Sequence, residues 1–142
     1  MKLSNKITGF FLFALLLGST STYAETAVIV SNSNANATMD SKTVSRIYLG
    51  KSSKFPNGEA AVPVDQADGS GVRDTFNESI LGKNSSQLKA YWSRLIFTGK
   101  GTPPKELGND AAVKEMVAKN PNMIGYIDSA AADDSVKVVL TF

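Results

Sequence analysis

The sequence predicts an α/β fold, with one domain built on an open, mainly parallel sheet of about four or five strands flanked by helices. Short apolar runs rich in β-branched residues alternate with segments whose apolar residues recur every three or four positions. One strand also passes through a glycine-rich turn directly into a helix, which is typical of strands joined by helical crossovers. The 142 residues suffice for one such domain and an export signal, not for two domains.

The start of the chain has the features of an export signal, which we expect to cover residues 1–24. Lys2 and Lys6 form a basic start, residues 9–17 form an apolar segment too short for a membrane span, and small residues precede a cleavage site after Ala24. Cleavage there would leave one exported, soluble domain at residues 25–142 without an integral membrane span. A retained N-terminal anchor is the alternative.

The first part of this domain contains two expected strands and one helix. Residues 26–31 are apolar and rich in β-branched side chains, which favours a buried strand. After a polar loop, Asp40 is placed to cap a helix. The apolar face of that helix carries Val44, Ile47 and Tyr48. Residues 60–64 form the second strand, and Pro63 favours a short strand or one near an edge because it has no N–H to donate.

The remainder contributes three helices and two strands. The first helix follows the glycine-rich turn and ends at residues 81–82. The second is expected to bury one apolar side, made of Leu88, Tyr91, Trp92, Leu95 and Ile96. Pro121 ends the third helix. Residues 123–127 and 136–142 have the composition of strands.

The turn Asp68-Gly69-Ser70-Gly71 is the candidate binding site. Because it leads from a strand into a helix, free backbone N–H groups at the positive helix end can hold an anion. The two glycines let the backbone approach a ligand, and the Ser70 hydroxyl adds a donor. Arg73 can add a positive charge, or it can face solvent as long cations usually do. The alternative for the whole turn is that these residues only cap the helix.

The composition excludes several classes of function, because the chain has neither Cys nor His. Disulfides, thiol nucleophiles, His-based zinc sites and Ser-His-Asp triads are therefore ruled out, and no carboxylate pair indicates catalysis or a metal site. We expect no enzymatic activity, no metal and no cofactor. Two of the 15 lysines and arginines precede residue 25 and all 13 acids lie at or beyond it, so the exported domain is neutral. Neutrality gives no reason to expect nucleic acid or a membrane surface as a partner.

Three motifs resemble segments of the periplasmic phosphate-binding proteins of ABC transporters. Residues 47–51 (Ile-Tyr-Leu-Gly-Lys) are similar to the end of that family's first helix, residues 67–71 resemble its phosphate-binding turn, and residues 121–127 (Pro-Asn-Met-Ile-Gly-Tyr-Ile) resemble one of its strands. They occur in the family's order, and the resemblance spans residues 38–128. It implies a single lobe of a type II periplasmic-binding-protein-like fold, a periplasmic location and a phosphate or related oxyanion ligand.

The resemblance also implies roles for the turn residues. Asp68 would accept the proton of hydrogen phosphate, while the Ser70 hydroxyl, Gly71 and the backbone of Val72 would donate to phosphate oxygens. Gln66 stands where the family usually has an arginine that pairs with phosphate. Val72 stands where the family usually has a threonine whose hydroxyl donates. Both departures predict weaker binding or an altered choice of oxyanion.

Length separates the chain from the transport receptors of this family, which close two lobes on their ligand. The domain has room for one lobe, and a lone lobe forms half of a clamp. Our leading hypothesis is weak binding of phosphate or a similar oxyanion at the turn. The alternative is a non-transport envelope scaffold that binds a second protein, or itself, with the face that the other lobe would cover. An enzyme is the third and least supported hypothesis.

Overall fold

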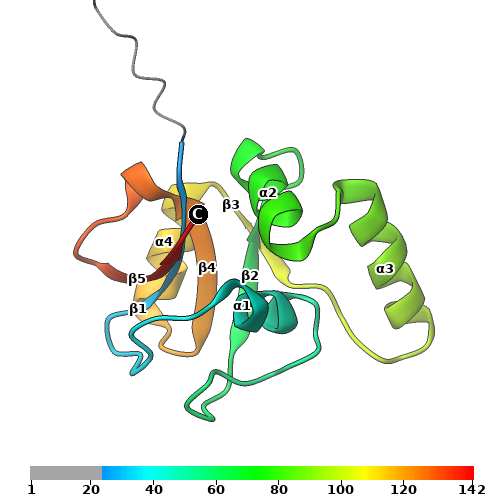
Figure 1. Ribbon diagram of the computed structural model, residues 1–142, viewed down its shortest axis with the longest axis horizontal. Coiled ribbons are helices and arrows are strands. Elements are labelled where there is room, and N and C mark those ends of the chain that lie inside the picture. The colour runs from blue at the N-terminus through cyan, green and yellow to red at the C-terminus, as the bar shows by residue number, and fades with distance from the viewer. Residues whose placement is uncertain (1–23) are drawn as a thin grey trace, which may run out of the picture.

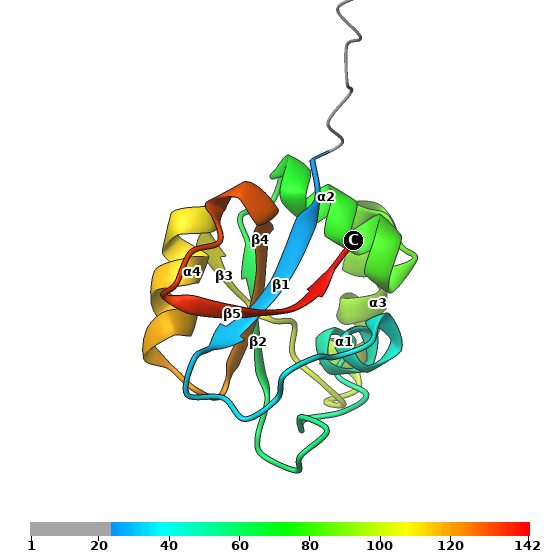
Figure 2. The same ribbon diagram turned by 60° about the vertical axis from the view of Figure 1, so that its left-hand side comes forward.

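The computed structural model describes residues 24–142. The predicted export signal therefore lies outside the described residues, apart from its last residue, Ala24. Within residues 24–142, no helix combines the length and the apolar character that crossing a membrane requires. The described chain forms one sheet with helices on both of its faces (Figure 1, Figure 2).

Five strands form the sheet, in the spatial order β3-β2-β4-β1-β5. Their bounds are β1 Thr26–Ser31, β2 Val62–Gln66, β3 Lys105–Gly108, β4 Met123–Asp128 and β5 Val136–Thr141. β2 is parallel to both β3 and β4, whereas β1 is antiparallel to both β4 and β5. The sheet is therefore mixed, and β1 runs against the direction that the other strands share.

The helices begin and end where local sequence signals place them. Their bounds are α1 Ser41–Tyr48, α2 Gly71–Phe76, α3 Ser85–Phe97 and α4 Asp110–Lys119, with a π-helical turn η1 Asn77–Leu81 after α2 and a 3₁₀ turn η2 Ser129–Ala131 after β4. As predicted, Asp40 caps α1, because its carboxylate accepts a hydrogen bond from the Thr43 N–H at 2.7 Å. The predicted α/β class with flanking helices is confirmed.

β1 is buried on both faces, as its apolar run predicts. Successive side chains of a strand point to opposite faces, so β1 supplies both apolar layers of the domain. Val28 and Val30 join the layer that includes side chains of α1 and α2, whereas Ala27 and Ile29 join the layer that includes side chains of α4. All four are fully buried. The sheet is therefore held in place from both sides, and the turn after β2 is fixed relative to it.

β3 is a strand that the sequence did not predict. Its four residues, Lys-Glu-Leu-Gly, include no β-branched side chain and are mostly exposed or half-buried. The strand forms because the backbone of Lys105 and Glu106 pairs in parallel with Val64 and Asp65 of β2. Tertiary pairing thus overrides weak local propensity, and it places Glu106 beside the end of β2.

The prediction that α3 buries a whole apolar side is wrong for part of the helix. Leu88 is buried, but Ile96 is 53% exposed and Phe97 at the helix end is 91% exposed. Three further apolar residues are half-buried, namely Tyr91, Trp92 and Leu95. The reason is that α3 stands beside the sheet instead of lying on it (Figure 1). One anchor is the Tyr91 hydroxyl, which donates to the Leu49 carbonyl at 2.6 Å.

Candidate functional site

The predicted strand–turn–helix unit is present at the end of β2. β2 ends at Gln66 and α2 begins at Gly71. Gly69 has a φ of 87°, a left-handed conformation that favours glycine and reverses the chain. Ser70 caps α2, because its hydroxyl oxygen accepts from the Arg73 N–H at 3.3 Å. The residues that suggested an anion site therefore also perform the capping role that was the alternative.

Two backbone donors of the turn remain available. Within residues 24–142, neither the Gly71 N–H nor the Val72 N–H has a protein acceptor, whereas the next two N–H groups of α2 are both bonded to Ser70. Gly71 is exposed, and a Cβ added to it would meet no heavy atom within 4 Å. Unpaired N–H groups at a helix start carry partial positive charge. This part of the turn can therefore donate to an anion from solvent.

The Gln66 side chain does not face an incoming ligand. It is 2% exposed, and its amide nitrogen donates to Asp110 Oδ1 at 2.6 Å and to the Tyr126 carbonyl at 3.1 Å. Its amide oxygen accepts the Ser70 hydroxyl at 2.7 Å. Gln66 thus ties the turn to α4 and β4, and the Ser70 hydroxyl is already engaged as a donor. Both side chains would need to exchange partners before they could bind an anion.

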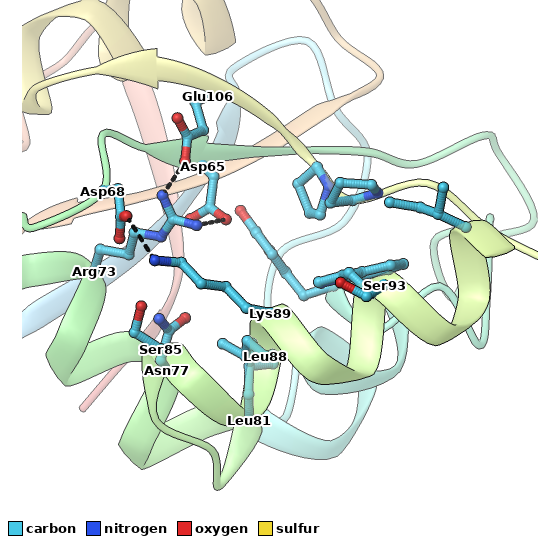
Figure 3. Close-up of a pocket in the computed structure, with 15 residues that line it drawn as sticks. Asp65, Asp68, Arg73, Asn77, Leu81, Ser85, Leu88, Lys89, Ser93 and Glu106 are labelled. Atoms are coloured by element: carbon cyan, nitrogen blue, oxygen red, sulfur yellow. Dashed lines mark hydrogen bonds and ion pairs between the residues drawn. The ribbon is translucent and has the colours of Figure 1, made fainter.

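Arg73 follows neither sequence expectation, since it reaches neither an open anion site nor bulk solvent. Its guanidinium turns inward, donating to the Gln66 carbonyl at 2.9 Å and lying 3.5 Å from Asp65 Oδ2. It also pairs with Glu106 on β3, and its side chain is only 18% exposed. Figure 3 shows the guanidinium between the two carboxylates. Arg73 therefore connects α2 to β2 and β3, and its charge is shared by these acids.

Asp65 is a buried charge that the sequence reasoning did not single out. It is 8% exposed, and it accepts a hydrogen bond from the Tyr126 hydroxyl on β4. Burial raises the pKa of the Asp65 carboxyl, although the Tyr126 hydrogen bond and the charge of Arg73 oppose the shift. Burial, followed by the nearby charge of Asp65, raises the pKa of the Tyr126 hydroxyl. The sequence signal that could have identified Asp65 is an acidic residue directly after the apolar part of a strand.

Asp68 joins the turn to α3. Its carboxylate lies 3.3 Å from the Lys89 ammonium, and both side chains are more than half exposed. The hydrogen bond from Lys89 and the charge of that residue lower the pKa of Asp68. Because the pair is solvated, it stabilises the fold little. The pair matters for the site, because Asp68, which is expected to accept a proton from a ligand, already has Lys89 as a partner.

A pocket of about 320 Å³ lies beneath α3, on one side of the turn (Figure 3). Asp65, Asp68, Arg73 and Glu106 form its charged end, and α3 supplies much of its apolar wall. A second hollow lies against the turn and is lined by residues 66–70, 107–109 and 112. Asp68 borders both. The described residues contain no group of three or more His, Cys, Asp or Glu side chains placed to hold a metal ion.

Comparison with known proteins places the fold of the chain among periplasmic-binding-protein-like folds. Residues 22–141 match a family model described as a PBP superfamily domain. A putative phosphate ABC transporter substrate-binding protein with bound phosphate from Clostridium perfringens is 28% identical, with a TM-score of 0.66 over 82% of this chain and 45% of that one. An ABC-type phosphate transport receptor from Vibrio cholerae, 20% identical with a TM-score of 0.63 over 82% and 46%, shares the fold. No curated protein sequence matches. The chain spans less than half of either structural relative.

Proposed function

The chain belongs to the PBP superfamily, and from that premise we propose that it binds phosphate or a related oxyanion weakly at the turn between β2 and α2. The observation that carries the proposal is the pair of backbone donors on Gly71 and Val72, which have no acceptor in the described chain. The Clostridium perfringens protein, which binds phosphate, supports this class of ligand. A helix start with free N–H groups suits a small anion.

The turn can both donate hydrogen bonds to hydrogen phosphate and accept one from it. The Gly71 and Val72 N–H groups donate to its oxygens, and the carboxylate of Asp68 accepts its proton. Ser70 adds a donor when its hydroxyl leaves Gln66. Sulfate carries no proton at neutral pH, so the turn favours phosphate. Affinity is modest, because Ser70 and Asp68 exchange existing partners and because Arg73 is held by acids.

The setting that we propose is the periplasm, with residues 1–24 as a cleaved export signal. A binding role without catalysis fits relatives described as a substrate-binding protein and a transport receptor. One lobe contacts an anion from one side only, so the ligand keeps part of its hydration and each hydrogen bond contributes less than in a closed site.

Gly71→Pro is expected to abolish anion binding without loss of stability. Gly71 is the first residue of α2, where proline is favoured, and Ser70 before it has the extended conformation that proline requires (φ −64°, ψ 130°). The substitution removes one of the two free donors and places a ring where the backbone is open. Isothermal titration with phosphate and with sulfate measures the effect.

Ser41→Pro is the matched control for this experiment. It places proline at the first position of α1, after the extended Asp40, and leaves the turn unchanged. It should titrate with phosphate like the unaltered protein. If the unaltered protein gives no heat with millimolar phosphate, or if Gly71→Pro binds as well as the control, the proposed site is wrong.

The exposed end of α3 supports the scaffold alternative as a second candidate. Ile96 and Phe97 are large apolar side chains at 53% and 91% exposure on one helix end. Such residues are costly to leave in water when they cluster, so they fit contact with a second protein or a second copy. This candidate predicts a dimer in size-exclusion chromatography that Phe97→Lys converts to a monomer. A chain that is monomeric at high concentration contradicts self-association.

A further inference from the structure

Asn77, the first residue of η1, is a buried polar side chain that the fold does not use. It is 3% exposed, and its side-chain amide takes part in none of the hydrogen bonds found among residues 24–142. It lines the pocket beneath α3, and Figure 3 shows its amide directed into that space, close to Ser85. An amide both donates and accepts, so a partner with one polar group can satisfy it.

The Asn77 amide is in contact with the pocket and is not sealed in the core. Among the described residues, no fully buried side-chain nitrogen or oxygen lacks a hydrogen-bond partner. The unbonded atoms of Asn77 therefore keep some exposure, and the pocket is the space that they face. A nearly buried amide without a hydrogen-bond partner is unfavourable. A molecule in the pocket that bonds to the Asn77 amide would supply the missing partner.

The walls around Asn77 are apolar on the side of α3. Leu88 and Trp92 line the pocket from the helix, Ile96 lies toward the helix end, and Pro103 and Pro104 close it from the following loop. Aromatic and proline surfaces of this kind bury the carbon body of a small molecule, as in most ligand pockets. A volume of about 320 Å³ lies at the small end of the usual range.

The charges of the pocket favour a cation over an anion. Its charged end has three carboxylates, on Asp65, Asp68 and Glu106, against the two cations of Arg73 and Lys89. Lys89 pairs with Asp68, whereas Arg73 is shared between Asp65 and Glu106. One carboxylate is therefore in excess. A phosphate ion would meet this excess negative charge and apolar walls, so this pocket is distinct in chemistry from the turn.

We propose that the pocket beneath α3 binds small organic ammonium ions with an apolar body. The carbon body lies against Trp92 and Ile96, and the ammonium group reaches the Asp65–Glu106 end. A polar substituent or the ammonium itself donates to the Asn77 amide oxygen. This site shares Asp68 with the oxyanion turn but uses none of the turn's backbone donors, and it gives the domain a ligand class that its family match does not assign.

A pair of phenylalkyl probes of opposite charge tests the charge requirement. The full chain is titrated by isothermal calorimetry with 2-phenylethylamine, which is a cation at neutral pH, and with 3-phenylpropionate, which is an anion. We expect millimolar or tighter binding of the amine and binding of the anion at least about tenfold weaker. No binding of the amine up to high millimolar concentration, or equal binding of the two probes, overturns the proposal.

Two variants place the binding in this pocket. Asn77→Leu removes the amide and is expected to weaken amine binding about fivefold to tenfold, the size of one hydrogen bond. Ile96→Lys adds a positive charge at an exposed position, so the variant should fold normally. We expect it to weaken binding of the amine more than Asn77→Leu does. The controls lie outside the pocket: Asn122→Leu makes the same change at an exposed loop position, and Val138→Lys introduces lysine at an exposed apolar position of β5. If both pocket variants bind the amine as their controls do, the assignment to this pocket is wrong.

Discussion

Replacing Gly125 by alanine is expected to destabilise the protein by about 3 kcal/mol, near the upper end for overpacked cores. Gly125 lies in the middle of β4 and faces α4. A Cβ at this position would lie 2.6 Å from Val113 Cγ1 and 3.0 Å from Val117 Cγ2. Both valines are fully buried, so neither can move into solvent to make room. Helix α4 must then shift away from the sheet and lose contacts along its length.

Urea denaturation measures this change, and a second glycine provides the matched control. A Cβ on Gly101 would meet Trp92 at 3.5 Å, an ordinary van der Waals contact, so Gly101→Ala should be close to neutral. Val113→Ala combined with Gly125→Ala should recover part of the loss, because it opens the space that the new methyl group needs. A Gly125→Ala protein with an unchanged denaturation midpoint contradicts this account of β4 packing.

This packing also explains one of the sequence motifs. Residues 121–127 were singled out by resemblance, and their glycine could have been assigned a ligand role. In the structure Gly125 is buried on β4, and the space beside it is filled by Val113 and Val117 of α4. Its small size permits close approach of the helix to the sheet. A family motif can therefore report packing, while the proposed binding residues lie elsewhere in the chain.

The sequence predicted the elements that depend on local signals. β1, the Asp40 cap and the turn from β2 into α2 follow from residue types within a few positions of one another. What it could not predict depends on distant partners. Gln66 is oriented by Asp110, which lies 44 residues further along the chain, and Arg73 by Glu106, 33 residues further. No local sequence pattern indicates that these two side chains already have hydrogen-bond or ion-pair partners.

The same limit applies to the pocket beneath α3. The apolar spacing of α3 correctly predicted a helix, but it could not show that the helix stands beside the sheet and leaves Ile96 exposed. Asn77 falls within the helix that the sequence predicts after the turn, but burial of its amide depends on how α3 and the following loop are placed. Local patterns thus predicted the scaffold, and tertiary placement created the second candidate site.

Replacing Arg73 by methionine is expected to cost about 3 kcal/mol, because it leaves the Asp65 carboxylate buried without its cation. Asp65 is 8% exposed and would retain the hydrogen bond from the Tyr126 hydroxyl but no cationic partner. Arg73 also donates to the Gln66 carbonyl at 2.9 Å, a bond that methionine cannot make. Arg94→Met on α3 is the matched control, since Arg94 is exposed and forms no ion pair in the described chain, and it should be nearly neutral.

The pH dependence of the Arg73→Met protein distinguishes a lost charge pair from a general packing defect. Burial already raises the pKa of Asp65, and loss of the neighbouring cation raises it further. The folded state then binds a proton more tightly than the unfolded state, so stability falls as pH rises through the interval between the two pKa values. The deficit relative to the unaltered protein should therefore be smaller at about pH 5 than at about pH 8.

A double variant completes the argument, because it removes both charges and keeps the shape of the site. Asp65→Asn with Arg73→Met retains an acceptor for the Tyr126 hydroxyl and leaves no buried charge, so it should recover most of the lost stability and lose the added pH dependence. If the double variant is no more stable than Arg73→Met, the cost comes from lost packing of the arginine side chain. In that case Asp65 is not the charge that holds Arg73 away from the turn, and the weak oxyanion binding proposed there needs another cause.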